Sequence, residues 1–295
     1  MTLSRRRFLT ISASFAVVPH IATAHSWQGH AFGAEVSVTI HGPKDPAQTA
    51  LIDAHQMIRR VEALFSLYDP ASALSQLNAT GVLLRPDPLF YALMQAAQTA
   101  YDLTDGLFDP TVQPLWSALA QNQIPDHGPA ASTNAIGWHR VQTTPQAIRL
   151  AKGQALTFNG IAQGFATDLV SDVLQNHGLT NTLVNIGEYR GQGGPWRLGL
   201  YDPDHGDLGM RTVTTGAIAT SSPRATPLGQ HGHIVHPTAH PQWSTVSVEA
   251  PSATLADSLS TAMVLAPLDQ IKAIKARAAV SRITLVDPFG DLITV

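Results

Sequence analysis

The sequence predicts an α+β protein, built from mixed or antiparallel sheets with helices packed on them. Many short segments alternate apolar and polar residues or are wholly apolar, and they often follow one another directly. Helical patterns lie in separate blocks, and the regular strand-helix alternation of a parallel sheet is absent. With 44% hydrophobic and 13% charged residues in 295, the chain can bury a large core. No linker-like segment divides it, so we expect one domain over residues 25–295.

Residues 1–24 have the pattern of a twin-arginine export signal. Arg5 and Arg6 precede a short apolar run, "ISASFAVV", and the small-residue site "ATA" ends at Ala24. A membrane anchor is disfavoured because the apolar run is too short to cross a bilayer. We therefore expect a periplasmic protein that begins near His25 and does not span the membrane. The chain has no cysteine, and its formal net charge of −3 gives no reason to expect a nucleic-acid partner.

The first third of the chain should start loosely and then form a strand and several helical segments. The alternation in "EVSVTIHG" predicts a half-buried strand. Apolar residues return at helical intervals over residues 48–65, and Ser72 then offers an N-cap for a short helical turn. Asp87 followed by Pro88 is the preferred order at a helix start, so a further helix should run from there to Gly106.

The rest of the chain is rich in short strands. After a polar surface excursion over about residues 121–134, strands are expected in "AIGWHRVQTT", "AIRLAKG" and "ALTFN". A helix over residues 162–176 should stop at Gly178. Strands follow in "NTLVNIG", "WRLGLYD", "MRTVTTGAIATS", "HIVHP" and "STVSVEA". A helix that begins near Thr254 and another over residues 268–277 precede a final strand pair that starts in "SRITLVD".

The segment "TFNGIAQGFATD", residues 157–168, is a candidate binding loop. It contains Gly160 and Gly164 but matches neither G-x-G-x-x-G nor a glycine-lysine phosphate loop. A turn of small residues at a helix start can still present backbone N–H groups to an anion. The alternative is that the small residues only allow a strand and a helix to pack closely.

A second candidate lies in "TLADSLSTAM". Asp257 and Thr261 are four residues apart on a predicted helix, so they share one face, and Ser260 lies beside them. A carboxylate, hydroxyls and a backbone carbonyl are the hard oxygen ligands that Mg²⁺ accepts. The alternative is ordinary helix capping by Thr254 or Asp257.

A third candidate is the histidine-rich segment "HGHIVHPTAH". Imidazole suits zinc and copper, and His231, His233, His236 and His240 are close together in the sequence. The spacing fits a metal site poorly, since Pro237 ends the strand and no Cys or acidic ligand is nearby. A loop with one functional histidine is the better interpretation.

Nine segments in order along the chain resemble the successive motifs of the ApbE family, the FAD:protein FMN transferases. They are "AFGAEVSV", "LFSLYDPASALSQLN", "DGLFDPTVQPLW", "IGWHRV", "LTFNGIAQGFATD", "LVNIG", "IATSS", "GHIVHP" and "ADSLSTAM". The resemblance covers nearly the whole mature chain and implies a fold related to the T-fold. It also implies that the protein binds FAD and Mg²⁺ and transfers FMN to a Thr or Ser of a redox protein, releasing AMP.

The resemblance also implies roles for individual residues. Asp257, Thr261 and, with less support, Ser260 would be metal ligands, together with the backbone carbonyl of Gly160. His233 would help to deprotonate the acceptor hydroxyl. His233 and Asp257 are the two expected catalytic residues. The residues expected against FAD are Phe32, Tyr68, Leu107, Phe108, Asp109, Thr157, Gln163 and, through its backbone, Ile234.

Several positions differ from the usual family pattern. Thr157 stands where the family often has an acidic residue, and Gln163 where it commonly has Lys or Glu. His236 replaces an acid in "HPTAH", where "DPRTG" is expected, and "NIGEYRG" replaces "NIGGDIR". Two alternatives therefore stay open. One is a non-catalytic FAD-binding or flavin-delivery protein in redox-enzyme maturation, and the other is a periplasmic metal-binding protein that uses the histidine cluster.

Overall fold

The structure is a computed structural model that describes residues 24–121, 133–228 and 231–295. The predicted export signal lies outside the described residues except for Ala24, as does most of the excursion predicted at 121–134. Within these ranges, no helix is long and apolar enough to cross a membrane.

An eight-stranded sheet forms the base of the molecule, and all of its neighbouring strands are antiparallel. In spatial order its strands are β1 (Ala24–Ala31), β2 (Ala34–His41), β6 (Thr182–Asn185), β7 (Tyr189–Gln192), β10 (Gly216–Ser221), β13 (Thr245–Ala250), β14 (Arg282–Val286) and β15 (Leu292–Thr294). The interior strand β13 is buried along nearly its whole length because both faces of the sheet are covered.

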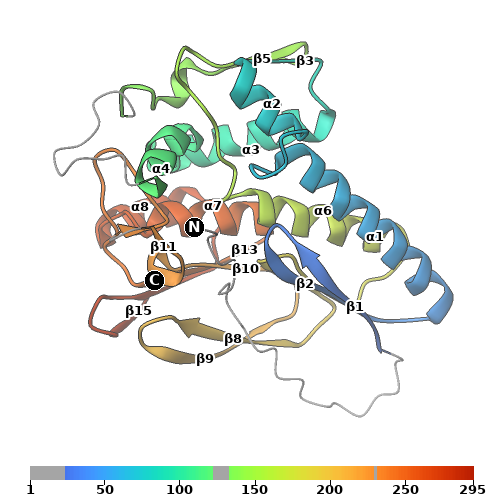
Figure 1. The fold of residues 1–295 in the computed structure, drawn as a ribbon. Coiled ribbons are helices and arrows are strands. Elements are labelled where there is room, and N and C mark those ends of the chain that lie inside the picture. The colour runs from blue at the N-terminus through green and yellow to red at the C-terminus, as the bar shows by residue number, and fades with distance from the viewer. Residues whose placement is uncertain (1–23, 122–132, 229–230) are drawn as a thin grey trace.

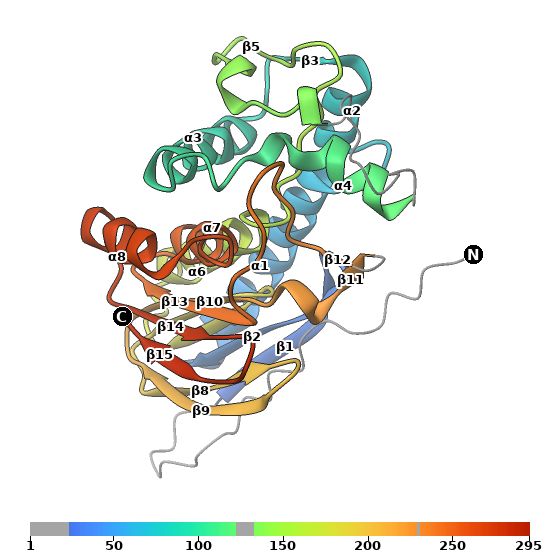
Figure 2. The ribbon, with the colours of Figure 1, turned by 90° about the vertical axis from the view of Figure 1, so that its left-hand side faces the viewer.

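Helices cover one face of this sheet in two layers (Figure 2). The layer next to the sheet holds α1 (Lys44–Phe65), α6 (Ala162–Asn176), α7 (Ala253–Met263) and α8 (Leu268–Arg277). The outer layer holds α2 (Ala73–Thr80), α3 (Pro88–Leu103), α4 (Gln113–Ala120) and a small sheet of β3 (Val82–Leu84), β5 (Ala147–Arg149) and β4 (Gln142–Thr143). The hairpin of β8 (Trp196–Asp202) and β9 (Gly206–Val213) lies on the opposite face of the large sheet (Figure 1).

The helical side of the core is built around four phenylalanines. Phe65 of α1 contacts Phe90, Phe158 and Phe165, with ring centroids 5.0, 5.6 and 6.2 Å away. Phe158 and Phe165 lie on either side of the turn that leads into α6, so burial of these rings fixes the turn against α1 and α3. The core therefore holds the candidate binding loop in place through these rings.

Local capping signals predicted the helix starts well. Ser72 Oγ accepts a hydrogen bond from Ser75 N (3.0 Å) at the start of α2, and Asp87 Oδ1 accepts one from Leu89 N (2.8 Å) at the start of α3. The predicted bounds of α6 and α8 are confirmed, and the helix expected from residue 48 begins earlier, at Lys44.

Three predictions of local structure were wrong, and a fourth was right only in part. The segment expected to be loose at the start of the described chain is β1, an edge strand paired with β2 along its whole length. "ALTFN" is not a strand, because the Asn78 side chain binds both Leu156 N (2.7 Å) and Leu156 O (2.8 Å) in place of a neighbouring strand. "HIVHP" also forms no strand, since β12 ends at Gly232.

Much of "AIGWHRVQTT" is likewise not extended. Residues Trp138–Arg140 form a short 3-10 helix, η2, and only Gln142–Thr143 pair as a strand, β4. Gly137 precedes η2 with a φ of +157°, and Gly137 N donates to Thr111 Oγ1 (2.7 Å). This bond ties the segment to the loop after Asp109.

Candidate active site

The start of α6 and the second and third turns of α7 place several oxygen atoms together. Thr261 Oγ1 lies 3.5 Å from the carbonyl oxygen of Gly160, and Gly164 N donates to Asp257 Oδ2 (2.9 Å). Asp257 is only 3% exposed. The structure thus brings together the predicted carbonyl, hydroxyl and carboxylate, which are residues about a hundred positions apart in the chain.

Glycine at position 160 is required by this close approach. A Cβ built on Gly160 would lie 2.8 Å from both Oγ1 and Cγ2 of Thr261. The small residues of "TFNGIAQGFATD" therefore do allow close packing, as the plainer interpretation held. The packing they allow also brings the Gly160 carbonyl close to the Thr261 hydroxyl, while anion binding at this turn stays a prediction.

Ser260 takes a different position from the other predicted metal ligands. Its fully buried hydroxyl lies 2.8 Å from Ser221 Oγ at the end of β10 and also donates to the carbonyl of Asp257 (3.0 Å). Ser221 Oγ in turn lies 3.3 Å from Thr261 Oγ1. The Ser260 hydroxyl thus fixes α7 to the sheet, and Ser221 links it to Thr261.

Two carboxyl groups of this site, Asp257 and Glu188, have raised pKa values because they are buried. Burial raises the pKa of Asp257 to about 7, the hydrogen bond from Gly164 N–H opposes the shift, and the charge of Asp168 adds to it. Burial and the charge of Asp257 raise the pKa of Glu188 well above its ordinary value, against the hydrogen bond from Thr220 N (3.0 Å). A divalent cation beside Asp257 would offset the cost of burying its charge, so these residues fit an Mg²⁺ ion.

His233 is connected to the same oxygens through the end of β10. Ser221 is followed after one residue by Pro223, whose carbonyl accepts hydrogen bonds from His233 N (3.1 Å) and from the ring Nδ1 (3.0 Å). Because a carbonyl can only accept, Nδ1 carries the proton. Burial lowers the pKa of His233, against hydrogen bonds to the backbone of Pro223 and Thr226. The ring is therefore neutral near pH 7, which a proton acceptor requires.

The predicted flavin-contacting loops are joined by hydrogen bonds. Asp109 Oδ1 accepts from Thr111 N (2.8 Å) and Thr111 Oγ1 (2.6 Å) at the start of a short 3-10 helix, η1 (Pro110–Val112). Thr157 N donates to the Pro110 carbonyl (2.9 Å), which ties the loop before α6 to this segment. Phe108 is buried and Leu107 packs between the two large core clusters, so both act as anchors of the segment.

The remaining predicted flavin contacts lie in three further places. Phe32 occupies the turn between β1 and β2 with a φ of +52°, and its N–H donates to Glu62 Oε1 (3.0 Å). Gln163 covers Gly187, where a Cβ would lie 2.4 Å from Gln163 Nε2. Ile234 is buried beside β13 and α7, while Tyr68, just after α1, is 72% exposed. Tyr68 is thus the one predicted contact that lies chiefly in solvent.

The histidine segment makes contacts of other kinds than a metal cluster. His236 Nδ1 accepts from Ala239 N (3.0 Å) and Thr238 N (3.2 Å), and burial lowers its pKa while the charge of Asp109 and a hydrogen bond to Gly106 oppose this. In the described parts of the chain, no group of three or more His, Cys, Asp or Glu side chains could hold a metal ion. The side chain of His231 lies outside the described set. The histidine-cluster alternative gains no support from these contacts.

Comparison with known proteins identifies the family. A model of the ApbE family matches residues 32–283, well over half of the chain. The chain belongs to the ApbE family. The predicted α+β fold also has ApbE counterparts: flavin transferase ApbE from Vibrio cholerae superposes with a TM-score of 0.80 at 22% identity, covering 93% of this chain and 97% of that one. The apo form of flavinyl transferase ApbE from Pseudomonas stutzeri gives 0.78 at 23% identity, covering 92% and 94%.

Several ApbE relatives carry the name FAD:protein FMN transferase. The one from Treponema pallidum (strain Nichols) is 27% identical over 265 residues, covering 75% of this chain and 72% of that protein. The one from Rhodobacter capsulatus is 25% identical over 295 residues, covering 89% of this chain but only 55% of its own length. The chain thus spans about half of that ApbE relative.

The raised pKa of Asp257 predicts how the stability of the metal-free protein should depend on pH. The folded protein holds an extra proton between the ordinary carboxyl value of 3.8 and about 7, so this residue's contribution to stability is greatest below that window and is lost as the pH rises through it. Without Mg²⁺, Asp257→Asn should therefore be more stable than wild type at pH 8, by about 2 kcal/mol, and equally stable near pH 4. Thermal unfolding of both proteins across this range measures the difference, and a pH-independent difference would contradict a buried ionising Asp257.

Proposed function

We propose that the protein is a Mg²⁺-dependent FAD:protein FMN transferase, which acts in the periplasm on a Thr or Ser of a redox protein. The observation that carries the proposal is the meeting of the Gly160 carbonyl, the Thr261 hydroxyl and the buried Asp257 carboxylate between α6 and α7. The shared name of the ApbE relatives supports the reaction. The leader-like residues 1–24 support the periplasmic location.

These three groups would hold Mg²⁺ where the pyrophosphate of FAD binds. When bound, the ion would neutralise the charge that develops on the leaving AMP. The side chains of Asp257 and Thr261 project from adjacent turns of one rigid helix, and Gly160 is fixed by the buried phenylalanines before and after it. The chain therefore supplies a preformed oxygen set and does not have to reorganise during the reaction.

His233 is suited to take the proton of the acceptor hydroxyl. As the hydroxyl oxygen forms a bond to the phosphorus of the FMN half, the bond from that phosphorus to the bridging oxygen breaks and AMP leaves. The proton of the hydroxyl goes to His233, whose half-buried, neutral ring can accept it. The Pro223 carbonyl fixes the ring orientation through Nδ1, as general bases require.

The flavin is proposed to lie against the loops that precede η1 and α6 and those around Phe32, Tyr68, Gln163 and Ile234. The hydrogen bond from Thr157 N to Pro110 O joins the two loops, so a ligand bound against one loop would also contact the other. Gln163 and Thr157 are uncharged, so these two residues would recognise FAD by hydrogen bonding and apolar contact.

The proposal is tested with purified protein lacking the leader, incubated with FAD, Mg²⁺ and a redox protein that carries a candidate Thr or Ser. We expect AMP release and an acceptor heavier by the mass of FMN less water, and neither in the presence of a chelator. A yellow protein that holds FAD stoichiometrically and releases no AMP would instead establish the alternative, a non-catalytic FAD-binding or flavin-delivery protein.

A further inference from the structure

Helices α6 and α7 run antiparallel and are linked by polar contacts at three levels. Gly160 contacts Thr261, Gly164 contacts Asp257, and Asp168 contacts the start of α7 at Ala253 and Thr254. From one level to the next, the residue number rises by four along α6 and falls by four along α7, which is about one helical turn in each helix. Two levels belong to the proposed metal site, and the third, at Asp168, does not.

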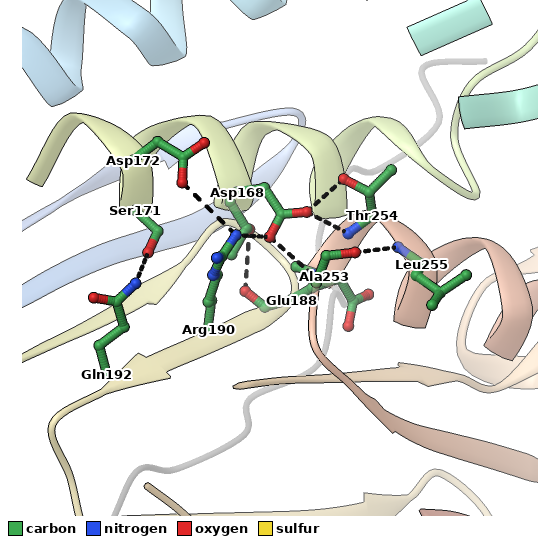
Figure 3. Close-up of polar contacts among 11 residues, drawn as sticks. Asp168, Ser171, Asp172, Glu188, Arg190, Gln192, Ala253, Thr254 and Leu255 are labelled. Carbon is green, nitrogen blue, oxygen red and sulfur yellow. Dashed lines mark hydrogen bonds and ion pairs between the residues drawn. The ribbon is translucent and has the colours of Figure 1, made fainter. Parts of the chain in front are cut away.

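The contacts at Asp168 use both of its carboxylate oxygens (Figure 3). Oδ1 accepts from Ala253 N (2.8 Å) and from Arg190 Nη1 of β7 (2.5 Å), while Oδ2 accepts from Thr254 N (2.9 Å) and Thr254 Oγ1 (2.6 Å). A carboxylate at the first N–H groups of a helix satisfies orphan donors and complements the helix dipole. Here the capping carboxylate comes from another helix, so it fixes α7 to α6.

Arg190 in turn fixes Asp168. The side chains of Arg190 and Asp168 are 18% and 13% exposed, so their ion pair is shielded from solvent. Asp172 Oδ1 also lies 4.0 Å from Arg190 Nη1. Figure 3 shows Asp168 between Arg190 and the start of α7, at Ala253 and Thr254. The strand β7 thereby anchors the contact to the large sheet.

The position of the α7 start determines where the metal-binding oxygens lie. A helix is rigid over one turn, so a shift at Ala253 is passed to Asp257 four residues later. Gly164 leaves no room to absorb such a shift, since a Cβ there would lie 2.3 Å from the Ala253 carbonyl oxygen.

We propose that Asp168, held by Arg190, is a positioning residue that sets α7 against α6 and so sets the geometry of the Mg²⁺-binding oxygens. This inference rests on the proposed function. Asp168 touches neither the metal nor the substrate in this role. It acts through the first turn of α7 and the placement of Asp257 and Thr261.

The test is the Asp168→Asn variant. An asparagine cannot accept all four hydrogen bonds, because its NH₂ group would face donors in either orientation. We expect the Mg²⁺ concentration for half-maximal AMP release to rise about tenfold, while kcat at saturating Mg²⁺ stays within about twofold. Calorimetric titration with Mg²⁺ alone should show the same weakening without any turnover. Should Asp168→Asn fail to fold, Arg190→Lys, which keeps the charge but loses the planar donor group, should shift the Mg²⁺ dependence in the same direction.

Asp87→Asn is the matched control. Asp87 also caps a helix, since its Oδ1 accepts a hydrogen bond from Leu89 N (2.8 Å), and it also pairs with an arginine, Arg60 (2.9 Å), but it lies at the start of α3. This control should leave the Mg²⁺ dependence unchanged. A wild-type Mg²⁺ dependence in Asp168→Asn, or an equal shift in Asp87→Asn, would overturn the positioning role. Failure of the proposed function is a separate result, in which the wild-type protein itself releases no AMP with FAD, Mg²⁺ and acceptor.

Discussion

Replacing Asp257 by Asn is expected to lower the rate of Mg²⁺-dependent AMP release by about a thousandfold. The amide has nearly the shape of the carboxylate, and its oxygen can still accept the hydrogen bond from Gly164 N (2.9 Å). The substitution therefore removes the charge that a divalent cation requires and leaves the contact between α6 and α7 in place. Activity should be lost without loss of the fold, as followed by AMP release and thermal unfolding.

The neighbouring residue provides the control for this substitution. Ser258 is equally buried on α7, but its hydroxyl donates only within the helix, to Thr254 O (3.0 Å) and Leu255 O (3.1 Å). Ser258→Ala should keep the rate within about twofold. If Asp257→Asn retained the wild-type rate and Mg²⁺ dependence, the metal site would have to lie elsewhere and the proposed mechanism would fail.

Elements with strong local signals could be predicted from the sequence. The Asp87-Pro88 pair fixes the start of α3, and the apolar spacing together with Gly178 fixes α6 at Ala162–Asn176. These signals succeed because the residues that decide the structure lie within one or two turns of each other. The order of motifs then identified the family, and with it predicted Gly160, Asp257 and Thr261 as the metal ligands of the proposed site.

Features decided by distant residues could not be predicted. β1 has one large apolar residue, Trp27, and is a strand because β2 pairs with it. The proposed role of Asp168 depends on its hydrogen bond with Ala253, which is 85 positions away. The pKa of Glu188 is raised by its burial and by Asp257, and the fold is needed for both. In the sequence Asp168 is merely the last residue of the glycine segment. The sequence of "IATSS" likewise gives no sign that Ser221 contacts Ser260 of α7.

Gly164→Ala is expected to have the second large effect, through packing. A Cβ at this position would lie 2.3 Å from the Ala253 carbonyl oxygen and 2.8 Å from Asp257 Cβ, so α6 and α7 would have to separate. Overpacking of this kind costs about 1–3 kcal/mol, which the better helix propensity of alanine, about 1 kcal/mol, offsets only in part. Because the Gly164 N–H bond to Asp257 would lengthen, we also expect AMP release to fall by about a hundredfold.

Gly178→Ala separates the two causes of this loss. Gly178 follows the same helix with a φ of +75°, and no atom lies within 4 Å of a Cβ built there. Alanine at this position costs about 1 kcal/mol of backbone strain without any clash between α6 and α7. The two variants should therefore have similar thermal stability but very different rates. Equal rates would show that the close approach of α6 and α7 is needed for folding only, whereas a low rate in Gly164→Ala alone ties the spacing of these helices to the reaction.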